Sequence, residues 1–193
     1  MKISEIITNS RRILSCYFFN LLELFAVKTE FFYQILMSWR KPVFVNEIQM
    51  ANVHSDDNIL LIGCGIFPSE VMVIANQTGA QVTGIDNSST AVRLAKKFIM
   101  QKNLNKQITI LYADGTNLTV KDFDIIFIAI NVFPIDQVLK NLSTQIEKGT
   151  KIMCKSIKHD IPQVFKNSRL DTCFDIIDTL ENPRTQSYLL IKK

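Results

Sequence analysis

Residues 58–193 carry two alternating kinds of apolar pattern. Apolar runs occur at 59–62 and 82–85, and a longer run at 123–130 is typical of a strand buried on both faces. Residues 108–111 and 151–156 are also strand-like. Between these runs, apolar residues recur at helical spacing after Pro68, Ser88 and Pro134, and Gly149 is expected to end the last of the three helices. This order of elements predicts an α/β fold with a doubly wound, Rossmann-like parallel sheet.

The C-terminal part of the chain has a different pattern. Residues 159–167 can form a short helix, and the strand-like runs 174–177 and 188–191 follow it. Asn182-Pro183-Arg184 lies between these two runs and favours a turn. The predicted sheet therefore ends in an antiparallel hairpin.

The N-terminal segment, residues 12–39, is unusually apolar. A membrane-spanning helix needs about 18 or more nearly uncharged residues, and Glu23, Lys28 and Glu30 interrupt this one. Its polar residues come close to a single helical stripe: Asn20, Glu23, Glu30, Gln34 and Ser38. We expect residues 1–50 to form a helical cap on a domain of residues 51–193, with Pro42 interrupting the helix. A dimer surface and a membrane-surface helix are the alternatives.

Residues 58–86 form the most informative stretch of the chain. They read as a strand, a turn with Gly63-Cys64-Gly65, a helix, and a second strand that ends on Asp86. Glycines let a ligand approach the backbone closely, and the N-terminus of the helix offers free N–H groups. An acid at the tip of the second strand is placed to bind ribose hydroxyls. The unit predicts a nucleotide site.

The type of nucleotide depends on the third position of the glycine motif. A dinucleotide site usually reads GxGxxG, but Pro68 stands where the third glycine is expected. This favours S-adenosylmethionine over NAD, although an NAD-dependent oxidoreductase remains an alternative. Asp114, with Gly115 and Thr116, follows the third strand, where a carboxylate can accept a hydrogen bond from an adenine amino group. An Asp-Gly pair is also common in ordinary turns.

Composition narrows the function only slightly. The net charge is +4, with basic residues scattered among acids, so it does not indicate nucleic acid. The four cysteines, Cys16, Cys64, Cys154 and Cys173, stand far apart and form no metal or redox motif. Cys64 is expected to be a small turn residue, with a nucleophile as the alternative. With no secretory signal evident, we expect a cytoplasmic protein.

Four stretches resemble the class I S-adenosylmethionine-dependent transferases, and nicotianamine synthase and its archaeal relatives in particular. They are LIGCGIFPSEV (61–71), FDIIFIAINVF (123–133), KIMCKSIKH (151–159) and NPRTQSYLLIKK (182–193). The resemblance implies S-adenosylmethionine as co-substrate. It places Gly63, Cys64 and Gly65 beside its amino-acid end and sugar, and Asp86, with Asn87, at its ribose. Asp114, Gly115 and Thr116 would hold the adenine, while Ile130 and Asn131 would line the pocket near the sulfonium. The same assignments also follow from the positions of these residues at the ends of the predicted strands, where ligands of α/β sheets bind.

The resemblance also suggests the chemistry. Glu47 is the tentative general base, because a Glu in the family's N-terminal helices faces the reacting amine. Methyl transfer to a small-molecule acceptor is the first expectation, since the N-terminal helical region is short. The first alternative is transfer of a 3-amino-3-carboxypropyl group to an amine, which releases methylthioadenosine. The second alternative is a non-catalytic protein that binds the cofactor or docks a partner. Residues 131–134 lack the [DN]PP[YF] motif, so a nucleic-acid substrate is less expected. A homodimer through the N-terminal helices is possible.

Overall fold

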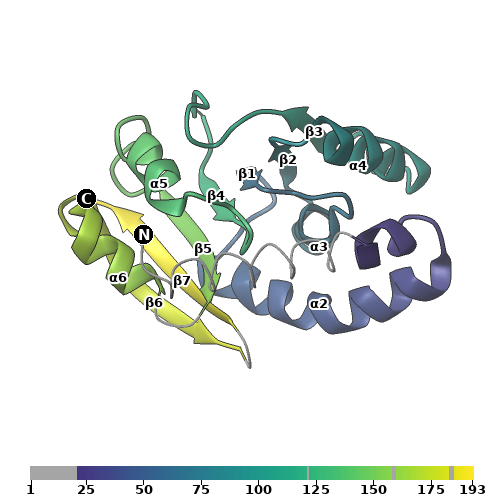
Figure 1. Cartoon of the computed structure of the whole chain (residues 1–193), viewed down its shortest axis with the longest axis horizontal. Coiled ribbons are helices and arrows are strands. Elements are labelled where there is room, and N and C mark those ends of the chain that lie inside the picture. The colour runs from purple at the N-terminus through teal and green to yellow at the C-terminus, as the bar shows by residue number, and fades with distance from the viewer. Residues whose placement is uncertain (1–20, 121, 158–159, 183–184) are drawn as a thin grey trace, which may run out of the picture.

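The computed structural model describes residues 21–120, 122–157, 160–182 and 185–193 (Figure 1). Residues 1–20, which include much of the predicted cap, and residues 183–184 of the predicted hairpin turn lie outside this part. The helices are α2 (Glu30–Ala51), α3 (Ser69–Thr78), α4 (Ser89–Gln101), α5 (Ile135–Ser143) and α6 (Asp160–Ser168), followed by the short 3-10 helix η1 (Leu170–Thr172). The strands are β1 (Asn58–Ile62), β2 (Gln81–Asp86), β3 (Ile108–Tyr112), β4 (Ile125–Ile128), β5 (Lys151–Ile157), β6 (Phe174–Glu181) and β7 (Thr185–Lys192).

The seven strands form one mixed sheet in the order β3-β2-β1-β4-β5-β7-β6. Strands β1 to β5 pair in parallel, whereas β7 runs antiparallel between β5 and β6. This arrangement confirms the predicted doubly wound sheet with its terminal hairpin. The strand order reverses between β1 and β4, and ligands of open α/β sheets bind at such a reversal, outside the carboxyl ends of the strands.

Helices cover both faces of the sheet, and the central strands supply alternate residues to two cores. In β1, Ile59 and Leu61 join a core with α2, α3 and α4, while Leu60 and Ile62 join a core with α5 and α6. Figure 1 shows these two groups of helices on opposite sides of the sheet. Burial on both faces explains why the strands read as continuous apolar runs rather than as alternating ones.

Helix α2 runs through Pro42, so the predicted interruption at this residue is wrong. Leu36 before the proline and Phe44 and Ile48 after it are all buried in the same core. An internal proline costs about 3 kcal/mol, but each large apolar side chain that is buried contributes about 1.5–3 kcal/mol. Burial of both halves of α2 therefore outweighs the local cost of Pro42.

Helix α5 ends earlier than the sequence predicts. The last helical residue is Ser143 and not the residue before Gly149. Gly149 adopts φ +90° and its N–H donates to the carbonyl of Lys192 at 2.9 Å. The glycine thus belongs to the turn that leads into β5 beside the end of β7.

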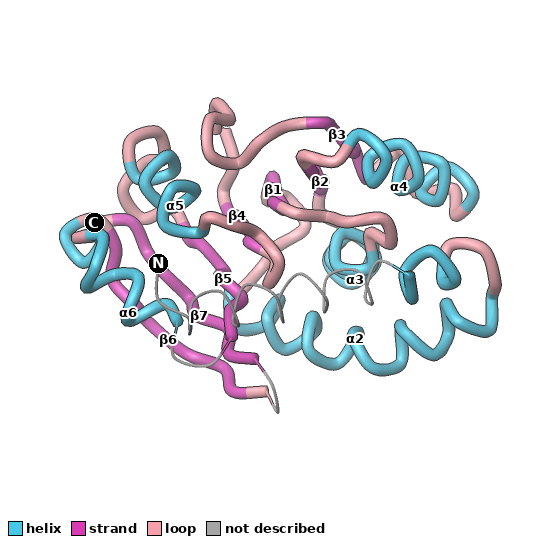
Figure 2. Tube along the Cα trace, viewed as in Figure 1, coloured by secondary structure: helices cyan, strands magenta, loops and turns pink. Residues whose placement is uncertain are grey.

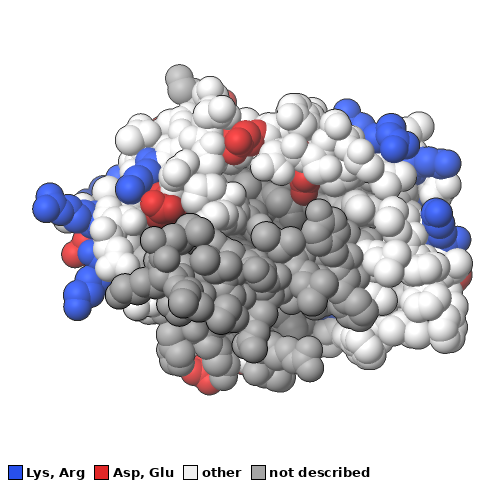
Figure 3. All heavy atoms as spheres, in the orientation of Figure 1, with Lys and Arg blue, Asp and Glu red and all other residues white. Residues whose placement is uncertain are grey.

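The described surface of the N-terminal helices is partly apolar. Phe31 is 69% exposed and Trp39 is 71% exposed on α2. Within the described residues, no helix has the length and apolar character needed to cross a membrane. Figure 3 shows Lys and Arg side chains gathered at the two ends of one face, with acidic side chains between them.

Candidate functional site

The loop after β1 forms a tight glycine turn at Gly63–Gly65. The N–H groups of Gly63 and Cys64 both donate to the carbonyl of Ile85, at 2.8 and 2.9 Å. Gly63 has φ +86° and Gly65 has φ +69°, a region that favours glycine. A Cβ on Gly63 would lie 2.6 Å from Cγ2 of Val132. The loops after β1 and β4, drawn in pink in Figure 2, therefore pack together here, and a side chain at Gly63 would clash with Val132.

Asp86 connects the end of β2 to the glycine turn. Its Oδ2 accepts a hydrogen bond from the N–H of Gly65 at 2.9 Å, and its Oδ1 accepts one from the N–H of Ser88 at 2.9 Å. Asn87, between Asp86 and Ser88, is exposed. Ser88 is the N-cap of α4, and its side chain accepts from the N–H of Ala91. The structure thus brings Gly65, Asp86 and Asn87 together.

The other predicted cofactor residues follow β3 and β4. Asp114 Oδ1 accepts from the N–H and the hydroxyl of Thr116, at 2.9 and 2.8 Å. A Cβ on Gly115 would lie 2.8 Å from Cγ2 of Ile62, so this turn packs against the end of β1. Ile130 is half-buried and Asn131 is exposed in the loop after β4. All ten predicted cofactor residues thus lie at the carboxyl ends of four neighbouring parallel strands.

Cys64 has the environment of a structural thiol. Burial raises its pKa above the usual range of a cysteine, and the nearby Asp86 carboxylate adds to this shift. A thiol that stays protonated is a poor nucleophile. This environment therefore favours the interpretation of Cys64 as a small turn residue over its interpretation as a nucleophile. Among the described residues, no three His, Cys, Asp or Glu side chains gather as a metal ion would require.

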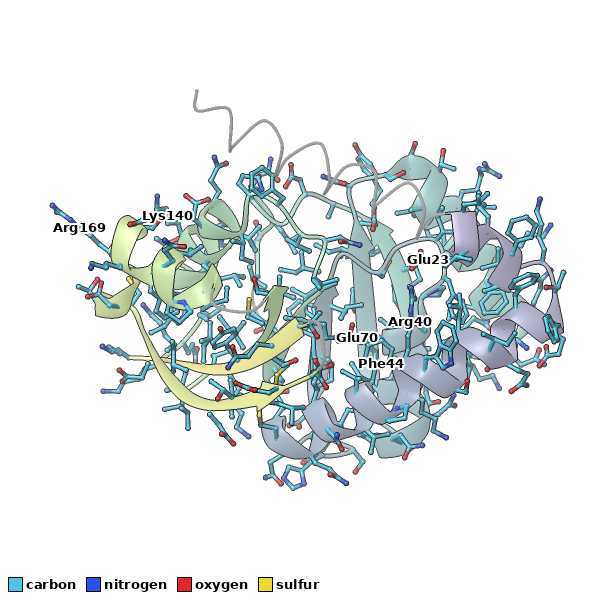
Figure 4. The ribbon with its side chains drawn as sticks, turned by 60° about the horizontal axis from the view of Figure 1, so that its bottom comes forward. Glu23, Arg40, Phe44, Glu70, Lys140 and Arg169 are labelled. Carbon is cyan, nitrogen blue, oxygen red and sulfur yellow. The ribbon has the colours of Figure 1, made fainter. Side chains whose placement is uncertain are left out.

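Glu23 lies at the glycine turn, although the sequence placed it in the polar stripe of a long helix. The helix breaks at residues 27–29, before α2 begins. Glu23 Oε1 accepts from Arg40 Nη2 at 3.0 Å, and Glu23 Oε2 accepts from the N–H of Phe67 at 3.4 Å. The position that a Cβ on Gly65 would take is 3.1 Å from Glu23 Oε2. Figure 4 shows Arg40 rising from α2 toward Glu23.

Glu47, the tentative base, lies in a buried ion cluster between α2, α3 and the sheet. Its side chain is 0% exposed, and it accepts a hydrogen bond from the hydroxyl of Ser187. Lys155 Nζ lies 3.0 Å from Glu47 Oε2 and 3.4 Å from Glu70 Oε2. Lys155 Nζ also lies 4.4 Å from the centre of the Phe44 ring. Glu47 therefore has partners on both of its oxygens, and its role as a base stays a prediction.

The charges in this cluster are strongly coupled. Burial raises the pKa of Glu70 to about 7, and the Glu47 carboxylate adds to this, while Lys155 and Arg40 oppose it. For Lys155, burial alone would lower the pKa, but the Glu70 and Glu47 carboxylates outweigh it and raise the pKa. Lys155 is therefore held as a cation, and Glu70 changes its charge near neutral pH.

Sequence reasoning did not single out Arg40, Glu70 or Lys155. Local periodicity reports which residues share one helix face, but it does not report pairs that are far apart in the chain. One usable signal existed, because Lys155 interrupts the apolar run of β5, where a charged side chain needs a buried partner.

Comparison with known proteins finds a family model and solved structures that resemble this part of the chain. A family model described as a methyltransferase domain matches residues 59–149, which include all ten predicted cofactor residues. A nicotianamine synthase, MtNAS, solved in complex with S-adenosylmethionine, has TM-score 0.74 and 15% identity, covering 89% of this chain and 70% of MtNAS. An RNA methyltransferase from Salinibacter ruber, in complex with S-adenosyl-L-homocysteine, has TM-score 0.63 and 16% identity, covering 78% of this chain and 90% of that chain.

One curated relative adds a reaction type. The L-histidine 2-aminobutanoyltransferase of Yersinia pestis is 26% identical over 109 residues, which are 56% of this chain and 41% of that protein. The match thus spans about two fifths of the length of that relative.

A methyltransferase-domain model thus matches residues 59–149, and the solved structures share the fold. Both findings support the predicted class I S-adenosylmethionine-dependent superfamily, with S-adenosylmethionine as the co-substrate of a transferase domain. The likeness to nicotianamine synthase is a likeness of fold.

Proposed function

We propose that this protein transfers the 3-amino-3-carboxypropyl group of S-adenosylmethionine to an amine and releases methylthioadenosine. The observation that carries the proposal is how far the MtNAS fold extends over this chain. Residues 51–193 account for 143 of the 193 residues, so a superposition over 89% of the chain includes part of the N-terminal helices. The Salinibacter ruber methyltransferase covers only 78%. The aminobutanoyltransferase named above also transfers a four-carbon amino-acid unit rather than a methyl group, which favours the proposal.

In this proposal the ten residues at the strand ends hold the co-substrate. The glycine turn lies beside its amino-acid end and sugar, and Asp86 accepts hydrogen bonds from the ribose hydroxyls. A carboxylate oxygen has two lone-pair sites, so the backbone donors of Asp86 leave acceptor capacity for the ribose. Asp114 and Thr116 face the adenine, and Ile130 with Asn131 lies near the sulfonium.

The reaction is a substitution at carbon. The nitrogen lone pair of the acceptor forms a bond to the γ-carbon of the aminocarboxypropyl chain, and the carbon–sulfur bond breaks. Its electron pair stays on sulfur and gives the neutral thioether of methylthioadenosine. The amine loses one proton to a base or to water. Because positioning alone can supply much of the rate, the base matters mainly when the amine arrives protonated.

Glu47 remains the base proposed from the sequence, and Glu70 is a second candidate. A catalytic base works best with a pKa near the operating pH, and Glu70 meets this condition with a pKa of about 7. Glu70 lies in the first turn of α3, directly after the glycine turn. Turnover and S-adenosylmethionine affinity are measured for separate Glu47→Gln and Glu70→Gln variants. The base is the residue whose substitution lowers turnover and leaves the affinity unchanged.

Methyl transfer to a small-molecule acceptor is the second candidate function. Its support is the family model, which is described as a methyltransferase domain. The two reactions share one pocket and differ in which carbon the acceptor attacks.

One isotope experiment separates the two reactions. The purified protein is incubated with S-adenosylmethionine labelled in its methyl group, together with L-histidine or a small-metabolite extract. Label that stays in methylthioadenosine supports the proposed transfer. Label that moves to an acceptor, with release of S-adenosylhomocysteine, supports methyl transfer instead. Cofactor binding without either by-product would indicate a non-catalytic binding protein.

The proposed homodimer would use the N-terminal helices. Its support is the apolar surface of α2, where Phe31 and Trp39 are exposed. Analytical ultracentrifugation of the intact protein and of a Phe31→Ser, Trp39→Ser double variant tests this. A monomer in both cases would exclude this interface.

A further inference from the structure

We propose that Glu23 and Arg40 form a binding subsite for an α-amino-acid group directly on the glycine turn. The inference rests on the proposed function and names the part of the site that would recognise the amino-acid chemistry of its substrates. Both residues come from the N-terminal helices and not from the sheet domain.

The two side chains are well placed on the turn. The Glu23 side chain is 13% exposed and the Arg40 side chain is 23% exposed, so water screens the pair only in part. Arg40 Nη2 binds Glu23 Oε1, whereas Glu23 Oε2 faces the turn, with the N–H of Phe67 at 3.4 Å. Arg40 Nη1 donates to the hydroxyl of Ser69 at 3.2 Å. The pair therefore lies between α2 and the start of α3.

This arrangement presents one negative and one positive group side by side. An α-amino acid at neutral pH carries an ammonium and a carboxylate on the same carbon. Its ammonium can donate to Glu23 Oε2, and its carboxylate can accept from the guanidinium of Arg40, which suits carboxylates geometrically. The N-terminus of α3 adds favourable electrostatics for the carboxylate. Both charges of the ligand would thus be paired in a partly desolvated place.

Two substrates of the proposed reaction can supply this group. One is the aminocarboxypropyl end of S-adenosylmethionine itself, and the other is an acceptor that is an amino acid. The shared chemistry is the zwitterion, and binding measurements distinguish the two sources.

The first measurement compares S-adenosylmethionine with methylthioadenosine by calorimetry. Methylthioadenosine keeps the nucleoside and the sulfur but lacks the amino-acid group. If the donor occupies the subsite, Glu23→Gln and Arg40→Met each weaken S-adenosylmethionine binding by about tenfold or more. Methylthioadenosine binding stays unchanged, and this also shows that the variants are folded.

The second measurement tests the acceptor. Protein saturated with methylthioadenosine is titrated with L-histidine and with histamine, which lacks the carboxylate. If an amino-acid acceptor occupies the subsite, both variants keep S-adenosylmethionine affinity but lose about tenfold or more in L-histidine affinity. Histamine binding should then depend on Glu23 and not on Arg40.

The matched control is Glu30→Gln, which breaks the exposed Glu30–Lys102 pair at the start of α2 and should change neither affinity. The inference is overturned if the Glu23 and Arg40 variants affect S-adenosylmethionine and methylthioadenosine equally. It is also overturned if they leave both S-adenosylmethionine and L-histidine binding unchanged, since the pair would then only anchor the N-terminal helices. Failure of the proposed function looks different, because the unaltered protein would then move the methyl label to an acceptor, or form neither by-product, whatever the binding measurements show.

Discussion

Asp86 holds two loops of the fold at the position where the sequence predicts a ribose site. Its two oxygens fix the backbone of the glycine turn and of the loop before α4. The sequence predicted its place at the tip of β2 from the spacing of the motif alone. Its hydrogen bonds to Gly65 and Ser88 could not be predicted, because they depend on how the turn folds back on β2.

Replacing Asp86 by Ala should weaken S-adenosylmethionine binding by about 1–3 kcal/mol, because a buried hydrogen-bond acceptor for the ribose is lost. Calorimetry measures the change. The matched control is Asp124→Ala, which removes a carboxylate that accepts from the N–H of Asn58 at the opposite end of β1. Equal affinity of the Asp86 variant and the unaltered protein would remove Asp86 from the site.

The thiol of Cys64 should resist alkylation in the folded protein, because burial and the Asp86 carboxylate keep it protonated. Cys154, fully buried with a pKa raised to about 12, should behave alike. Half-buried Cys173 should react first. Iodoacetamide labelling of a Cys16→Ser variant, followed by peptide mass spectrometry, compares the three rates. Rapid labelling of Cys64 without denaturant would reopen the nucleophile alternative.

Among the elements, α2 differs most from its sequence pattern. The central strands β1 and β4 were predictable because burial on both faces leaves an apolar run in the sequence. The continuation of α2 through Pro42 was not predictable from the sequence. The cost of the proline is local, whereas the packing that offsets it comes from α3 and the sheet. Local rules fail where distant contacts supply the deciding free energy.

Pro42→Ala should raise the free energy of unfolding by about 1–2 kcal/mol. The gain from restoring a helical hydrogen bond is partly cancelled, because proline also restricts the unfolded chain. Urea unfolding followed by circular dichroism measures the change. Lys41→Ala, an exposed neighbour in the same helix, serves as the control and should stay within about 0.5 kcal/mol. A lower stability of the Pro42→Ala variant would mean that Pro42 itself stabilises the folded state.

At the scale of the whole molecule, the buried cluster of Glu47, Glu70, Lys155 and Ser187 joins two helices on one face of the sheet to the sheet itself. It connects α2 to the start of α3 and to the neighbouring strands β5 and β7. Sequence reasoning identified Glu47 but not the other members of the cluster. Ser187 lies 140 residues from Glu47 in the chain, and Lys155 lies 85 residues from Glu70. Only the assembled fold brings these groups together.

The cluster should give the protein a characteristic pH dependence. The pKa of Glu70 is raised from 4.5 to about 7, so the folded state binds this proton more tightly than the unfolded state. The stability that it contributes is present below pH 4.5 and is lost as the pH rises through 7. Glu70→Gln, which cannot ionise, should lack this loss.

Urea unfolding of the unaltered protein and of the Glu70 variant at several pH values between 4.5 and 7.5 tests this expectation. Glu147→Gln, at an exposed position, is the control and should follow the unaltered protein. Parallel pH profiles for the Glu70 variant and the unaltered protein would show that Glu70 keeps an ordinary pKa.

The hydrogen bond and ion pair that Glu47 makes with Ser187 and Lys155 have a consequence for exchanging parts between relatives. A chimera that takes its N-terminal helices from another member of the superfamily would bring a new residue against Lys155 and Ser187. If that residue is apolar, Glu70 becomes the remaining carboxylate partner of Lys155. Residues 47, 155 and 187 therefore have to be exchanged together, and α2 cannot be replaced on its own.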